Sequence, residues 1–342
     1  MTCLPGRRLV ALAIAVGLAP PGFGQQVLNV YSARHYQTDE ALYAGFTKRT
    51  GITINRLEAG EDALIQRIVN EGAKSPADVL ITVDAGRLWR AQELGLFQPV
   101  KSAVLEGRIP ASFREPAGQW FGFSLRARVI AYDTTKVKPA DIQTYGQLAE
   151  PRWKGKICVR SGTHIYNLSL MGAMIEHLGE AQAEEWAKAV RANLARDPKG
   201  GDTDQIKGVA AGECEVALTN HYYYARLARS RKADEKAIAG RVGVVFPNQA
   251  TWGTHVNISG AGVLRNAPNR EAAVRFLEYL ASDDAQRYFA DGNNEWPAVP
   301  SVEVSNPALN ALGKFKHDPL NVAVLGRNQQ RSQKLYDRVA WK

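Results

Sequence analysis

The sequence is poor in cysteine and lacks the short motifs that mark common enzyme families. Only three of its 342 residues are cysteine, and no Cys-x-x-Cys pair occurs. Cysteines alone therefore cannot build a zinc cage. The chain also has no His-Glu-x-x-His, no Gly-x-Ser-x-Gly and no glycine-rich dinucleotide- or phosphate-binding pattern. These absences argue against a zinc protease, a serine hydrolase and a nucleotide-dependent enzyme, so no enzymatic activity is predicted.

Long basic blocks are missing as well. The formal net charge is +9, but the longest basic cluster is Arg229-Ser230-Arg231-Lys232 and no aromatic residues alternate with it. We therefore expect no nucleic-acid partner, and interpret the dispersed positive charge as a field that attracts anions or an acidic protein surface. With 45% hydrophobic and 23% charged residues, the composition is that of a globular chain long enough for two domains.

No apolar run in the N-terminal segment is long enough to span a membrane, but a short one is present. Arg7-Arg8 precede the apolar stretch 9–19, and small residues surround Gly24. This pattern predicts a signal peptide at residues 1–24, cleaved near Gly24, and export to the periplasm. Cys158 and Cys214 would remain after cleavage. In an oxidising compartment they are candidates for a disulfide, with two buried reduced thiols as the alternative.

Strand and helix patterns alternate along the remaining chain. Strands are predicted at 27–32, 52–57 and 77–83, with helices between them, which indicates an α/β lobe with a largely parallel sheet. The pattern repeats with strands at 156–160 and 213–219. Two long strand-like runs, 119–132 and 253–263, interrupt it and predict two crossings between lobes. The expected organisation is residues 25–125 as the first part of lobe 1, 126–254 as lobe 2, and 255–342 as the return to lobe 1 with C-terminal helices.

Four tyrosines at three predicted strand-to-helix junctions give the main functional signal. Tyr36 follows the first strand, Tyr166 opens a helix after strand 156–160, and Tyr222 and Tyr223 follow strand 213–219. In open parallel sheets, ligands bind beyond the carboxyl ends of the strands. The alternative is that these aromatic residues pack in a hydrophobic core or stack on a sugar. Because all three junctions face the same side of their sheets, we favour a shared ligand between the lobes.

Several phenol oxygens suit a hard, highly charged cation. Calcium would require carboxylates and carbonyls, and zinc would require Cys and His, whereas iron(III) gains most from anionic oxygen donors. A bound metal displaces the phenol proton, which otherwise leaves only near pH 10. Iron(III) is therefore the predicted ligand, with Fe(2+) as a second candidate. His35, beside Tyr36, is a candidate fifth metal ligand.

Four segments resemble the periplasmic ferric-ion-binding proteins of bacterial iron-uptake ABC transporters. The segments are Arg34-His35-Tyr36, residues 159–167, Asn220-His221-Tyr222-Tyr223 and residues 253–260. The resemblance implies an α/β protein of the type II periplasmic-binding fold, with two lobes, two crossing strands and a ligand cleft between the lobes. It also implies delivery of iron to an ABC permease in the inner membrane by a protein that is expected to be a monomer.

The same resemblance assigns roles to individual residues. It implies metal ligation by His35, Tyr36, Tyr166, Tyr222 and Tyr223, without an obligatory bound anion. Four phenolates around a +3 ion leave a charge of about −1 in a partly dry cleft, so a nearby cation is needed. Arg126 is the implied cation, with Arg34 as the alternative. Tyr224 is expected to pack, His164 and His221 to lie at the cleft rim, and His255 to be a packed histidine.

A second binding function stays open from the residues alone. The tyrosines could stack on a small organic solute such as a polyamine or a sugar. A polyamine site requires several carboxylates near the aromatics, and the sequence places few there. A screen of thermal stability against sugars, polyamines and ferric chelates separates these classes, since only a bound ligand raises the unfolding midpoint.

Overall fold

The computed structural model describes residues 1–2, 26–34 and 38–342. Most of the predicted signal peptide lies outside these ranges, as do His35 and Tyr36. The strands are β1 (Val27–Ser32), β2 (Thr53–Glu58), β3 (Val79–Thr82), β4 (Phe121–Asp133), β5 (Ile157–Cys158), β6 (Val216–Asn220), β7 (Val242–Val245), β8 (Val256–Val263) and β9 (Trp296–Pro297).

The helices cover both faces of these strands. They are α1 (Asp39–Thr50), α2 (Glu61–Glu71), α3 (Ala85–Glu93), α4 (Ala103–Arg108), α5 (Ile165–Leu178), α6 (Glu180–Ala192), α7 (Asp202–Ala210), α8 (His221–Arg229), α9 (Ala233–Arg241), α10 (Arg270–Leu280), α11 (Asp283–Asn293), α12 (Pro307–Leu312), α13 (Ala323–Arg327) and α14 (Gln329–Arg338). Short 3-10 turns occur at Gly72–Lys74, Ala111–Phe113, Pro139–Asp141, Gly146–Ala149 and Pro151–Trp153. Within the described ranges, none of the helices combines the length and apolar character needed to cross a membrane.

The first lobe forms around a mixed sheet in which β2, β1 and β3 are parallel and β8 is antiparallel to β3. Gly51 caps the C-terminus of helix α1, adopts a left-handed conformation with φ of 74° and donates its N–H to the carbonyl of Thr47. Phe46 on α1 packs edge-on against Phe276 of α10, 5.1 Å between ring centroids. This contact joins the start of the chain to its return segment, so one core is built from both parts of the lobe.

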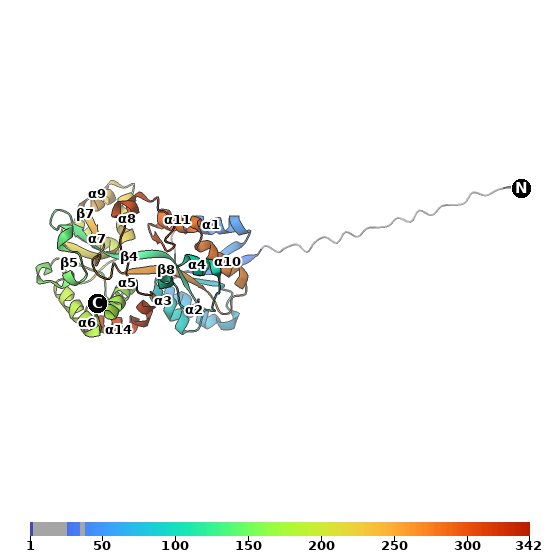
Figure 1. Ribbon diagram of the computed structural model, residues 1–342, viewed down its shortest axis with the longest axis horizontal. Coiled ribbons are helices and arrows are strands. Elements are labelled where there is room, and N and C mark those ends of the chain that lie inside the picture. Colours follow the sequence, from blue (N-terminus) through green and yellow to red (C-terminus); the bar gives the residue numbers. More distant parts are fainter. Residues whose placement is uncertain (3–25, 35–37) are drawn as a thin grey trace.

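Strand β4 belongs to both lobes. Its residues from Phe121 to Ala127 pair with β8 in the first lobe, and those from Arg128 to Tyr132 pair with β6 in the second. Figure 1 shows β4 and β8 running through the centre of the molecule, between helices α1–α4 on one side and α5–α9 on the other. All thirteen residues of β4 are buried, because helices and strands of both lobes cover it. The residue boundaries of the two lobes remain a prediction.

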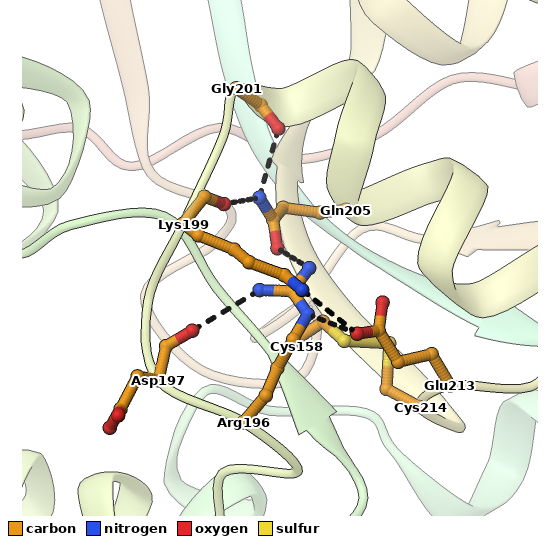
Figure 2. The surroundings of a disulfide bond; sticks show 8 residues. All are labelled: Cys158, Arg196, Asp197, Lys199, Gly201, Gln205, Glu213 and Cys214. Carbon is orange, nitrogen blue, oxygen red and sulfur yellow. Dashed lines mark hydrogen bonds and ion pairs between the residues drawn. A yellow bond between two sulfur atoms is a disulfide. The ribbon is translucent and has the colours of Figure 1, made fainter.

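The second lobe contains β6, β7 and the very short strand β5. Strand β5 pairs in parallel with β6 through only two residue pairs, Ile157 with Val216 and Cys158 with Ala217. A disulfide joins Cys158 to Cys214, two residues before β6. Figure 2 shows it beside the ion pairs that Glu213 makes with Arg196 and Lys199. The covalent bond holds β5 next to β6, the two strands that lead to Tyr166 and Tyr222.

The tail of the chain returns from the first lobe to the second. Helix α13 lies between α3 and α5, and α14 packs on α5 and α6 near the C-terminus (Figure 1). Trp341 is fully buried, and its carbonyl accepts the N–H of Gly162 while its indole N–H donates to the carbonyl of Arg160. A side chain at position 162 would meet the Trp341 carbonyl at 2.4 Å, so glycine is required there. The tail thereby fixes the turn that leads into α5.

Candidate functional site

Tyr166 lies in the first turn of α5, the helix that follows β5 after a six-residue connection. His164 precedes the helix, and its Nδ1 accepts the backbone N–H of Tyr166 at 3.2 Å, a side-chain N-cap. The His164 and Tyr166 rings pack edge to face with centroids 4.5 Å apart. Asn167 closes the preceding turn by donating to the carbonyls of Arg160 and Ser161. The local sequence thus sets both the start of the helix and the direction of the phenol.

Tyr222 and Tyr223 occupy the first turn of α8, directly after β6. Tyr222 is 1% exposed and Tyr223 is half-buried. Their rings lie 4.4 Å apart between centroids. Asn220, the last residue of β6, donates from Nδ2 to the Tyr222 hydroxyl at 3.3 Å. The strand therefore ends where the sequence predicts a junction, and the helix start presents neighbouring phenols.

The two helix starts bring their phenols together. The Tyr222 hydroxyl donates to the Tyr166 hydroxyl at 3.1 Å, across 56 positions of sequence. This contact exists because β5 and β6 are parallel neighbours, so that the helices after them begin at the same edge of the sheet. Two oxygens that would carry negative charge on ionisation thus share one small region of the second lobe.

Two arginines of β4 face these phenols from the point where the strand changes lobes. Arg126 and Arg128 are two residues apart, so their side chains lie on the same face of the strand. The Arg126 guanidinium lies 5.0 Å from the Tyr222 ring centroid, and its Nη1 lies 3.5 Å from the Tyr166 hydroxyl. Arg128 lies 6.0 Å from the Tyr166 ring, and Arg160 5.2 Å from the same ring. Fixed positive charge therefore surrounds oxygens whose ionised form is negative.

Each β4 arginine is anchored by a buried carboxylate of a different lobe. Glu295, between α11 and β9, accepts Arg126 Nη2 at 2.7 Å, whereas Asp202 at the start of α7 accepts Arg128 Nη1 at 2.7 Å. Both carboxylates are at most 1% exposed. Burial by itself would raise the pKa of Glu295, but the positive charges of Arg126 and Arg34 lower this pKa to about 2. Glu295 is thus a fixed negative charge next to the crossing strand.

The histidines near the tyrosines have structural contacts. His221 was expected at the cleft rim, but it is fully buried and its Nδ1 accepts the backbone N–H of Ala127. Burial lowers the pKa of His221 to about 4. His255 is buried, as expected of a packed histidine, and burial lowers its pKa to about 3. The rim prediction for His221 was wrong because the ring is needed to satisfy the β4 backbone beneath α8.

A buried carboxylate of the first lobe contacts the helix that carries Tyr166. Asp84 caps α3 by accepting the Gly86 N–H, and its other oxygen accepts Ser169 Oγ at 2.9 Å and Asn257 Nδ2 at 2.6 Å. Ser169 lies on α5, one turn after Tyr166. Burial raises the pKa of Asp84 to about 7, and the negative charge of Glu61 adds to the increase. The contact between the lobes therefore includes a carboxyl that titrates near neutral pH.

We expect the stability of the protein to depend on pH through Asp84. Because its folded-state pKa lies above the value for a solvated carboxyl, the stabilisation is complete at low pH and is lost as the pH rises through 7. In Asp84→Asn this loss is absent. The difference in unfolding free energy, wild type minus variant, should therefore fall by at least about 1 kcal/mol between about pH 4 and about pH 8. Urea denaturation of both proteins across this range measures it, and parallel curves would contradict the assignment.

Comparison with known proteins places this architecture in a family. The family profile for bacterial extracellular solute-binding proteins matches residues 74–316. The chain belongs to this family. Iron uptake protein A2 of Synechocystis is 50% identical over 338 residues, covering 98% of this chain and 96% of that protein. The major ferric iron-binding protein of Neisseria meningitidis serogroup B is 28% identical, covering 96% and 97%.

A solved structure resembles the whole described fold. The Trichodesmium protein in complex with iron and citrate ligands superposes with a TM-score of 0.90 at 54% identity, covering 92% of this chain and all of that one. The chain has the type II periplasmic-binding fold that was predicted from the sequence, with two α/β lobes joined by crossing strands. The predicted resemblance to ferric-ion-binding proteins is also confirmed.

The structure brings together some of the predicted site residues. Tyr166 and Tyr222 are in contact, Tyr223 packs on Tyr222, and Arg126 lies against both Tyr166 and Tyr222. His35 and Tyr36 lie outside the described residues, and metal ligation by any of the five remains a prediction. Sequence reasoning missed the anchors Glu295 and Asp202. Arg-x-Arg within a buried strand was an available signal that carboxylates must face it, but nothing indicated which ones.

Proposed function

We propose that this solute-binding protein captures iron(III) between its lobes and delivers it to an ABC permease for iron uptake. The observation that carries the proposal is the 3.1 Å contact between the hydroxyls of Tyr166 and Tyr222. Two oxygens bound side by side to one small cation at about 2.0–2.2 Å lie roughly 3 Å apart. Phenolate oxygens are donors that a hard trivalent ion prefers. Among the described residues no group of three or more His, Cys, Asp or Glu could hold a metal, which favours phenolates as the donors.

The ligand set that we propose is the predicted one: Tyr36, Tyr166, Tyr222 and Tyr223, with His35 as the fifth ligand. The second-lobe tyrosines would bind first, and closure about β4 and β8 would add the first-lobe ligands. Arg126 would offset part of the excess negative charge. Iron would leave when protons return to the phenolates, or when an external one-electron reductant converts it to iron(II). We also propose that the protein is exported to the periplasm, that its signal peptide is cleaved near Gly24 and that it acts as a monomer. The proposed function includes no enzymatic step.

The contacts of the tyrosine rings argue against stacking on a sugar or a polyamine. Arg126 lies over the Tyr222 ring and Arg160 over the Tyr166 ring, so guanidinium groups already occupy ring faces. These positive charges would also repel a polyamine cation. The same charges stabilise phenolates, which iron(III) requires. The electrostatics of the site therefore favour the metal over the organic solute.

Titration of the purified mature protein with ferric citrate tests the proposal. We expect a visible tyrosinate-to-iron charge-transfer band that saturates at one iron per chain, together with a higher unfolding midpoint. Citrate alone, spermidine and a panel of sugars serve as controls and should leave the midpoint unchanged. Repeating the titration with an iron source free of citrate tests the prediction that no anion is obligatory. Absence of the band with every ferric source would rule out iron(III) binding through phenolates.

A further inference from the structure

Glu295 joins the end of β1 to the crossing strand β4 through two arginine side chains. One of its oxygens accepts Arg126 Nη2 at 2.7 Å, and the other accepts Arg34 Nη1 at 3.0 Å. Ser124 Oγ, two residues before Arg126 on β4, also donates to Glu295. Arg34 lies two residues after the end of β1. A single carboxylate thus joins the first strand of lobe 1 to the strand that crosses into lobe 2.

The burial of this cluster makes the arrangement rigid. Arg34, Arg126 and Glu295 are each at most 2% exposed. Arg34 is held on its other side by Asp39, which accepts its Nε at 2.9 Å and its Nη2 at 3.2 Å. Ser259 of β8 accepts Arg34 Nη1 at 2.7 Å. The two arginines and two carboxylates balance in charge, so removal of any one of them would leave a buried charge without compensation.

The orientation of Arg126 follows from this cluster. With Nη2 bound to Glu295, the planar guanidinium directs Nη1 toward the Val83 carbonyl at 3.2 Å and the Tyr166 hydroxyl at 3.5 Å. The same plane lies 5.0 Å from the Tyr222 ring centroid. A guanidinium is a fixed fork, so holding one nitrogen sets the position of the other. Loss of the carboxylate would remove this constraint and allow the position of Arg126 relative to both phenols to change.

We propose that Glu295 is a positioning residue of the iron site, which holds Arg126 against Tyr166 and Tyr222 and so sets the electrostatic environment of their phenolates. The inference rests on the proposed iron-binding function. Outer partners of metal ligands commonly change metal affinity by about 10- to 100-fold when removed. Glu295 is 129 positions from Tyr166 and 73 from Tyr222 in the sequence, and we expect its effect on these two phenols to pass through Arg126, which contacts both.

A double-mutant cycle with Glu295→Gln and Arg126→Gln tests this route. Each single variant should weaken iron(III) binding by about tenfold or more and shift the charge-transfer band, and the double variant should be no worse than either single one. Ser124→Ala, which keeps every charge but removes one hydrogen bond to Glu295, should shift the band in the same direction by a smaller amount. It supplies a readout if Glu295→Gln folds poorly.

Asp78→Asn is the matched control. Asp78 is also a fully buried carboxylate of the first lobe, but it accepts hydrogen bonds from Asn29 and Asn269, away from the tyrosines. This variant should lose stability while the folded protein keeps the wild-type band and affinity. If Glu295→Gln keeps the wild-type band and affinity, or if the effects of the two substitutions add in the double variant, the positioning role of Glu295 is wrong. Either result would leave the iron-binding function intact. No band in the wild type would instead refute the iron-binding function.

Discussion

Replacing Tyr222 with phenylalanine should reduce iron(III) affinity by about 100-fold or more, since even the loss of an outer partner of a ligand costs about 10- to 100-fold. Tyr222 is 1% exposed, and phenylalanine keeps its ring packing against Tyr223 and Arg126. The change therefore removes one hydroxyl and little else. Competition against a ferric chelator measures the affinity, and the charge-transfer band should weaken in parallel because one phenolate donor is gone.

Tyr224→Phe is the control for this experiment. Tyr224 lies two positions further along α8, is half-buried and packs against the cluster formed around Leu227 and Val242. It was expected to pack rather than bind, so its variant should retain wild-type affinity and colour. Equal losses in the two variants would mean that the helix, and not the Tyr222 oxygen, carries the effect. Unchanged affinity in Tyr222→Phe would remove this residue from the ligand set.

Replacing Asp202 with asparagine should destabilise the fold by about 3–5 kcal/mol, the range for breaking a buried ion pair by removal of one partner. Asp202 is fully buried and accepts Arg128 at 2.7 Å, Arg160 at 3.2 Å and the Asn220 backbone N–H at 2.8 Å. Asparagine keeps one acceptor oxygen but turns an amide donor toward guanidinium groups. Urea denaturation followed by circular dichroism measures the loss.

Asp204→Asn tests whether position in the helix, rather than the buried ion pairs, explains that loss. Asp204 is also in the first turn of α7, but it is exposed and accepts the Gly201 N–H at 2.7 Å. Asparagine can make the same cap, so the cost should be below about 1 kcal/mol. A similar loss in both variants would contradict the assignment of the larger effect to Arg128 and Arg160.

Strand boundaries were predictable only where backbone pairing continued to the end of the apolar run. The strand predicted at 156–160 narrows to Ile157–Cys158 because Asn167 binds the carbonyls of Arg160 and Ser161, which therefore leave the ladder. The strand predicted at 213–219 begins only at Val216, since the Glu213 N–H is still bound to Gly208 at the end of α7. Cys214 consequently lies before the strand rather than within it, although the disulfide itself is present.

The candidate site was also predictable from the sequence only in part. The strand-to-helix junctions at Tyr166 and Tyr222 could be predicted from the sequence, because an apolar strand followed by a capped helix is a local pattern. Their contact required β5 and β6 to be parallel neighbours, which their short pairing and the disulfide provide. The role of Glu295 could not be predicted from the sequence, because the pairing of a buried carboxylate with an arginine depends on the tertiary structure and not on their separation in the sequence.

The sequence by itself determined the kind of chemistry: phenols at the ends of strands, few thiols, an export pattern and a two-lobed α/β repeat. These properties follow from residue type and local periodicity, which act over a few positions of chain. Only the tertiary structure decided which oxygens meet and which charges face them. Burial forces each arginine of β4 to find a carboxylate, and the partners, Glu295 and Asp202, come from different lobes because β4 passes through both.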